Sequence, residues 1–168
     1  MAKTHILGFP RIGAQRELKH AVEAYWQGNI DQAALEAIGR QLRQLHWQHQ
    51  AQAGLEWVSV GDFSWYDQVL DHSMLFGVIP ERFNDDSNSD VSLDTYFRMA
   101  RGRAPSGEPT AACEMTKWFD TNYHYLVPEF VKNQPFTLRS TKLFLITTKA
   151  KPFLEVAQPW LVFVTQHT

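Results

Sequence analysis

The sequence has little that would tie it to a disulfide, a membrane or a nucleic acid. Its 168 residues include a single cysteine, Cys113, which excludes an internal disulfide and a zinc site built from paired cysteines. No apolar run is long enough to span a bilayer, and the N-terminus MAKTHILGFP lacks the apolar core of a secretory signal. The formal net charge of −2 argues against a protein that works mainly by binding phosphate backbones. We therefore expect a cytoplasmic protein without a nucleic-acid or membrane partner.

What is present is enough apolar sequence for a core, arranged as alternating strands and helices. Hydrophobic residues make up 44% of the chain and charged residues 20%, in a length typical of one domain. The first half predicts a strand over Thr4–Phe9, a helix over Gln15–Gln27, a second helix from a cap at Asp31 towards Gly54, and a strand over Leu55–Val60.

The second half predicts fewer strands than a closed sheet would need. We expect Ser64 to cap a helix over Trp65–Phe76, a short helix over Asp94–Ala100, and a buried strand over Tyr123–Val127 that Pro128 ends. The run LFLITT at 143–148 is β-prone, and PWLVFVT at 159–165 is apolar enough for a buried strand. The order strand–helix–strand predicts an α/β protein with a parallel sheet. An eight-stranded barrel needs about 200 residues or more, so the chain forms at most half of one.

Several residue groups are candidates for a site, and each has an ordinary structural alternative. Asp62 follows a predicted strand, where ligands collect in α/β folds, but it is also a typical turn residue. His46 and His49 lie on one helix face, yet no third ligand is near for a metal. Arg101 and Arg103 lie in a Gly- and Pro-containing loop that suits an anion or simply faces solvent.

The densest aromatic stretch, EMTKWFDTNYHYLVPEF at 114–130, leads into a resemblance that covers about residues 5 to 143. With HILGFPRIGAQRELK and WVSVGDFSWYD, it resembles the N-terminal part of cobalamin-independent methionine synthase. Members of that family transfer a methyl group from 5-methyltetrahydropteroyl-polyglutamate to homocysteine. The family has two facing (β/α)8 barrels, so the resemblance implies that this chain is a partial TIM barrel, about half of the N-terminal one.

The resemblance also implies a binding site for the folate polyglutamate. Family positions that contact this substrate match Arg16, Glu17, Leu18, Lys19 and Lys117, all present here. Lys and Arg offer charge-assisted hydrogen bonds to the carboxylates of a polyglutamate tail. Arg101 and Arg103 are weaker candidates for the same role. Without the resemblance, RELK would be an ordinary solvated helix face.

The family's catalytic chemistry is expected to be missing from this chain. Its zinc ligands belong to the second barrel, so the resemblance implies no catalytic residue, no metal and no cofactor here. We divide the sequence into residues 1–142, the family-like portion, and 143–168, where the likeness fades into a divergent tail. The leading explanation for that tail is a truncated gene or a disrupted reading frame.

Three hypotheses for function follow. The first is a truncated, inactive fragment of the synthase that retains affinity for the folate tail. The second is an enzyme half that pairs with a separately encoded C-terminal barrel. The third is a free-standing module that binds folate or another polyanion. Because three or four strands cannot close a barrel, we also expect self-association through the uncovered edges and aromatic face.

Overall fold

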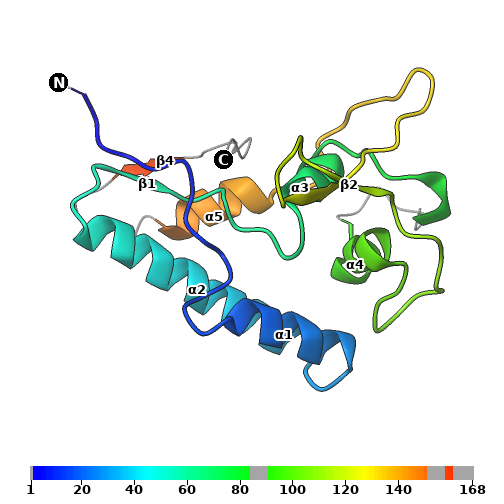
Figure 1. Cartoon of the computed structure of the whole chain (residues 1–168), viewed down its shortest axis with the longest axis horizontal. Coiled ribbons are helices and arrows are strands. Elements are labelled where there is room, and N and C mark those ends of the chain that lie inside the picture. The colour runs from blue at the N-terminus through cyan, green and yellow to red at the C-terminus, as the bar shows by residue number, and fades with distance from the viewer. Residues whose placement is uncertain (1, 84–90, 151–157, 161–168) are drawn as a thin grey trace. The chain divides into compact units, whose positions relative to one another are not determined.

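The computed structural model describes residues 2–83, 91–150 and 158–160. The chain divides into two compact units (Figure 1). Unit 1 combines Met1–Trp65 with Lys142–Thr168, and unit 2 is Tyr66–Thr141. The mixture of helices and strands agrees with the predicted α/β character, while the sequence boundary at residue 142 stays a prediction. Among the described residues, no helix is long and apolar enough to cross a membrane.

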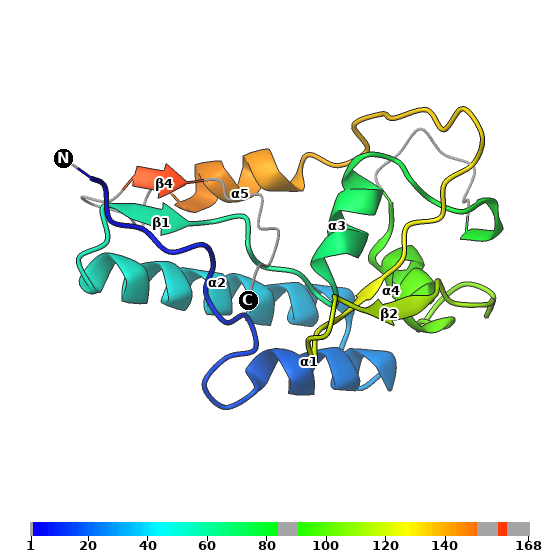
Figure 2. The ribbon, with the colours of Figure 1, turned by 45° about the horizontal axis from the view of Figure 1, so that its top comes forward.

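Unit 1 begins with two helices that the apolar spacing predicted closely. α1 spans Glu17–Trp26 and α2 spans Gln32–Gln52. Asp31 caps α2 as expected, because its side chain accepts a hydrogen bond from Ala34 N at 2.8 Å. Apolar side chains of both helices are buried, and Figure 2 shows α1 lying alongside α2.

The strands of unit 1 are short and parallel. β1 (Trp57–Ser59) pairs with β4 (Gln158–Trp160) in parallel register. The predicted strand at Leu55–Val60 is therefore confirmed in a shorter form, and residues 161–165 of the last predicted strand lie outside the described residues.

The prediction of a strand over Thr4–Phe9 is wrong. This segment runs beside β1, but side chains replace most of the ladder between the two backbones. Thr4 O accepts from Trp57 N at 3.1 Å, whereas Thr4 Oγ1 accepts from Glu56 N and Ser59 Oγ donates to Ile6 O. The hydroxyls thus satisfy backbone groups that a regular strand would pair with backbone partners.

The β-prone run at 143–148 is also a correction, because it forms part of helix α5, Lys142–Ala150. Burial explains the difference. Ile146 and Ala150 join one core cluster with Trp47 of α2 and with Val58 and Val60. The helical spacing of Ile146 and Ala150 places both side chains in this core, and tertiary packing overrides the weak local preference for a strand.

Unit 2 is built around a helix and a hairpin. Its elements are α3 (Gln68–Leu75), the 3-10 turn η1 (Glu81–Phe83), α4 (Leu93–Arg101), β2 (Met115–Lys117) and β3 (His124–Leu126). α3 contacts β3 within this unit (Figure 2). The helix predicted over Asp94–Ala100 is confirmed as α4. The predicted loop at Asn84–Asp90 lies outside the described residues.

Two expectations for unit 2 are wrong. Asp67, rather than Ser64, caps α3, because its carboxylate accepts from Leu70 N at 2.9 Å. β2 and β3 form an antiparallel hairpin instead of strands in a parallel sheet. The connection between them runs only from residue 118 to 123, which is too short for the crossover that parallel strands require.

Candidate functional site

The first group of predicted site residues lies at the start of α1. Arg16 is exposed and occupies the position before the helix with a left-handed backbone, φ 64°. Its N–H donates to Gly13 O at 3.1 Å, which closes the turn that leads into the helix. The side chain of Glu17 turns back to accept from Gln15 N at 3.0 Å. The turn is therefore fixed by its own hydrogen bonds, and the Arg16 guanidinium extends from its surface.

Leu18 and Lys19 have opposite environments. Leu18 is 2% exposed, and its N–H donates to Ile12 O, so it anchors the helix in the core. Lys19 is exposed and forms an ion pair with Glu23 one turn later, with 3.6 Å between the charged atoms. An exposed pair of this kind is weak, so the ammonium group can exchange Glu23 for another carboxylate at little cost.

The second group lies on the hairpin of unit 2. Lys117 is the last residue of β2, is exposed, and stands opposite the exposed His124 of β3. Beyond it, Trp118 N donates to Tyr123 O at 2.8 Å and extends the hairpin pairing by one bond. Here the sequence predicted a strand only over Tyr123–Val127, and the structure adds the strand that contains Lys117.

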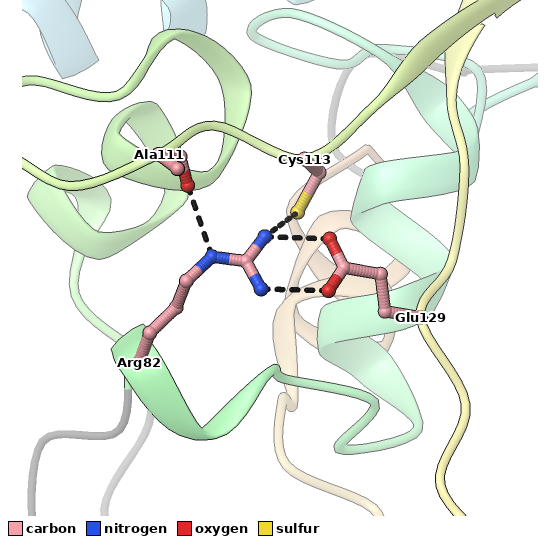
Figure 3. Close-up of polar contacts among 4 residues, drawn as sticks. All are labelled: Arg82, Ala111, Cys113 and Glu129. Atoms are coloured by element: carbon pink, nitrogen blue, oxygen red, sulfur yellow. Dashed lines mark hydrogen bonds and ion pairs between the residues drawn. The ribbon is translucent and has the colours of Figure 1, made fainter.

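A partly exposed arginine–carboxylate contact set fixes the base of this hairpin (Figure 3). The Arg82 guanidinium donates to Ala111 O at 3.0 Å, to both carboxylate oxygens of Glu129 at 2.5 and 2.6 Å, and contacts Cys113 Sγ at 3.9 Å. Ala111 and Cys113 precede β2, and Glu129 follows β3. One side chain therefore holds together the two ends of the segment that carries Lys117.

The electrostatics of this contact set follow from its geometry. The Arg82 hydrogen bonds lower the pKa of Glu129, and the same bonds raise the pKa of Arg82. Burial, followed by the nearby Glu129 charge, raises the pKa of the Cys113 thiol to about 11. Cys113 therefore stays protonated near neutral pH and acts as a packing residue rather than a nucleophile.

Asp67 fixes the hairpin at a second point. Besides capping α3, its carboxylate accepts from Tyr123 OH at 2.5 Å and from Leu126 N at 3.3 Å. The hydroxyl of buried Tyr96 accepts from Tyr66 N and Asp67 N. Sequence reasoning missed Asp67 and Arg82. Their only sequence signal was being polar residues near predicted turns, which does not identify distant partners.

The basic loop after α4 is also ordered. Gly102 ends α4 in a left-handed conformation, φ 79°. The Arg98 side chain connects the helix to the loop by donating hydrogen bonds to Thr95 Oγ1 and to Glu108 O. Arg101 is half-buried, and its pKa is lowered by burial and then by the charge of Arg103, which is exposed. The structure thus places these two arginines in unit 2 with Lys117, whereas Arg16 to Lys19 belong to unit 1.

The histidine pair and Asp62 have structural partners in unit 1. The Phe9 ring stacks on His46 with 4.7 Å between centroids and lies 6.1 Å from His49. Asp62 accepts from Phe9 N at 2.5 Å, and burial raises its pKa. Within the described ranges, no group of three or more His, Cys, Asp or Glu side chains is placed to hold a metal ion.

Comparison with known proteins decides the family. A family model described as the N-terminal domain of cobalamin-independent synthase matches residues 3–165. The chain belongs to the cobalamin-independent synthase family. The match to the N-terminal domain of this family continues past residue 142, through the segment that contains α5 and β4.

Two curated relatives carry the name 5-methyltetrahydropteroyltriglutamate–homocysteine methyltransferase. The protein from Proteus mirabilis (strain HI4320) is 64% identical over 137 residues, which is 81% of this chain and 18% of the relative. The protein from Salmonella heidelberg (strain SL476) is 59% identical over 140 residues, 83% of this chain and 18% of the relative. The family resemblance expected from the sequence is confirmed, and the chain spans 18% of the length of these relatives.

Proposed function

We propose that the chain binds the polyglutamate tail of 5-methyltetrahydropteroyl-polyglutamate, with Arg16 and Lys19 as cationic contacts on unit 1 and Lys117 as a separate cationic contact on unit 2. The observation that carries this proposal is the exposure of Arg16 and Lys19 at the N-terminus of α1. Two cations and the positive end of the helix dipole there favour an anionic ligand. The names of the relatives indicate which anionic ligand this is, because they include a triglutamate, which is a string of carboxylates.

Glu17 and Leu18 have supporting roles in this proposal. Glu17 fixes the turn before α1, and Leu18 anchors the helix beneath the two cations. Arg101 and Arg103 are secondary contacts, because Arg101 is half-buried while Arg103 is exposed. Within unit 1, the parallel pairing of β1 with β4 supports the further proposal that the chain is a partial (β/α)8 barrel.

The chain by itself supplies substrate binding and not methyl transfer in this proposal. The described residues do not fit a zinc ion, since they bring no metal-binding group of side chains together. Methyl transfer would then require the zinc and homocysteine sites that the resemblance assigns to the family's second barrel. We expect this cytoplasmic chain, tested by itself, to self-associate through its uncovered strand edges.

The tail assignment is tested by titrating the chain with 5-methyltetrahydrofolate bearing one or three glutamates. We expect Lys19→Ala and Lys117→Ala to weaken triglutamate binding more than monoglutamate binding, and added salt to weaken triglutamate binding further. Equal loss for both ligands would show that the two lysines do not contact the tail.

Arg40→Ala is the matched control for Lys19→Ala. Arg40 also forms an exposed i,i+4 pair on a helix of unit 1, with Glu36 at 3.8 Å, so both changes remove a similar ion pair. Arg40→Ala should leave both affinities unchanged.

Methyl transfer is measured with zinc, homocysteine and 5-methyltetrahydropteroyltriglutamate present, first with the chain alone and then with the C-terminal barrel of a relative added. We expect turnover only in the second case. Turnover by the chain alone would overturn the division of roles, and light scattering of the chain alone reports self-association.

A further inference from the structure

The turn of the hairpin in unit 2 exposes an aromatic side chain beside Lys117. Phe119 is 77% exposed, which is the highest value among the exposed large hydrophobic residues that the structure describes. The turn itself is well ordered by hydrogen bonds, because Thr121 N and Thr121 Oγ1 both donate to Trp118 O. The exposure of this ring is therefore a property of a defined turn and not of a loose segment.

The backbone at Phe119 is in a conformation that its residue type disfavours. Among the described residues, three non-glycine residues have positive φ: Arg16 at 64°, Phe119 at 51° and Asn133 at 61°. Asn commonly adopts this region, whereas a bulky residue rarely does, and the cost is about 1–2 kcal/mol. Such outliers gather at ligand sites. Arg16 is already a proposed ligand contact, which leaves Phe119 as the outlier without a role.

The ring of Phe119 is held at the end of a row of aromatic side chains. Tyr125 and Trp118 lie edge to face, with 5.3 Å between centroids and 75° between planes. Trp118 and Phe119 repeat this arrangement at 5.4 Å and 86°. Edge-to-face pairs of this kind are favourable, so the row orients the outermost ring while its outward side remains open to solvent.

We propose that Phe119 is a specificity-determining residue that contacts the aminobenzoyl ring of the pteroylglutamate ligand. The inference rests on the function proposed above. Lys117 and Phe119 are two residues apart, which places their Cα atoms within about 7 Å of each other. In the ligand, an amide joins the aminobenzoyl ring directly to the first glutamate. The aminobenzoyl ring and the first glutamate carboxylate are therefore neighbours in the ligand, just as Phe119 and Lys117 are neighbours in the hairpin.

The test compares the folate with an N-acetylated triglutamate peptide, which keeps the amide and the carboxylates but lacks the pteroyl group. Calorimetric titration of the whole chain with 5-methyltetrahydropteroyltriglutamate is compared with titration using the triglutamate peptide. Phe119→Asn removes the ring while keeping a residue type that tolerates positive φ. We expect this variant to bind the folate about 2- to 10-fold more weakly, the range for one aromatic pair, and to bind the peptide unchanged. Phe119→Tyr should restore folate affinity.

Phe136→Asn is the control, since Phe136 is 64% exposed in the same unit but is remote in sequence from Lys117. It should change neither affinity. Unchanged folate affinity in Phe119→Asn, or equal loss for folate and peptide, would overturn the inference. A change in oligomeric state with ligand affinity unchanged would identify Phe119 as an interface residue and overturn it as well.

The same titrations separate this inference from the proposed function. Failure of the parent chain to bind either ligand would overturn both. Equal affinity of the parent chain for folate and peptide would overturn the ring contact alone, because the pteroyl group would then contribute nothing.

Discussion

Replacing Asp67 with alanine should destabilise α3 and the hairpin of unit 2 while leaving the stability of unit 1 unchanged. Asp67 is 3% exposed, and its two carboxylate oxygens accept three hydrogen bonds. One caps α3, one comes from Tyr123 OH at 2.5 Å, and one comes from Leu126 N in β3. No single neighbour of Asp67 can replace the carboxylate in all three contacts, so its removal affects a helix and a strand together.

The magnitude follows from what the change leaves unpaired. Loss of a helix cap costs about 0.5–2 kcal/mol, and each buried donor left without an acceptor costs about 1–3 kcal/mol. Since these losses share one site and do not add fully, we expect Asp67→Ala to lower the free energy of unfolding of unit 2 by about 3–5 kcal/mol. Asp67→Asn keeps an oxygen acceptor and should cost about 1–2 kcal/mol.

Amide hydrogen exchange is the suitable assay, because it reports the two units separately. Protection of the Leu70 and Leu126 amides should fall in Asp67→Ala, while that of Leu42 in α2 should be unchanged. A double-mutant cycle with Tyr123→Phe should give a coupling of about 1–3 kcal/mol. A coupling near zero, or protection at Leu126 within a factor of about ten of the parent, would refute the reasoning.

Three further outcomes follow from single side chains. Cys113 should react with iodoacetamide much more slowly in the folded chain than in urea at pH 8, because burial raises its pKa to about 11; equal rates would contradict its burial. Gly39→Ala should destabilise unit 1 by about 1–3 kcal/mol in urea unfolding despite better helix propensity, since a Cβ there would overlap Cη2 of the Trp65 ring. A gain in stability would show that the ring moves freely. Burial and then His49 lower the pKa of His46, so the unfolded chain takes up the proton first and unit 1 should lose stability as the pH falls below about 6.5. His46→Gln should remove that slope in urea unfolding between pH 5 and 7, and an unchanged slope would assign it to another group.

Local sequence signals predicted the helices whose ends and burial are decided locally. α2 begins at Asp31 because the cap and the apolar stripe agree. The cap of α3 could not be chosen in the same way, because Ser64 and Asp67 are both acceptable capping residues. The choice depends on Tyr96, which lies thirty residues from Tyr66 in the sequence. The Tyr96 hydroxyl accepts hydrogen bonds from Tyr66 N and Asp67 N, just before the helix. Such a contact has no local signature.

In the candidate site, too, some features follow from local sequence and others depend on distant contacts. The family resemblance predicts Arg16, Lys19 and Lys117 as ligand contacts, and this assignment stays a prediction. The structure shows that all three residues are exposed. Their backbone setting was not predictable, because a left-handed Arg16 follows no turn rule for arginine. The strand at Lys117 was missed for a related reason. Its stability depends on pairing with β3 and on distant side chains, and not on the three residues of β2 alone.

These distant side chains explain how a hairpin of two three-residue strands is held in place. Two strands of this length are marginal in water without support. Arg82 fixes the chain on both sides of the hairpin, and Asp67 fixes Tyr123 and Leu126 within it. The turn between Lys117 and Tyr123 is held mainly by its own hydrogen bonds and by the aromatic row. Support at the base and hydrogen bonds at the turn hold Lys117 and Phe119 in a defined hairpin, so the ligand contacts proposed for them would cost little ordering of the protein.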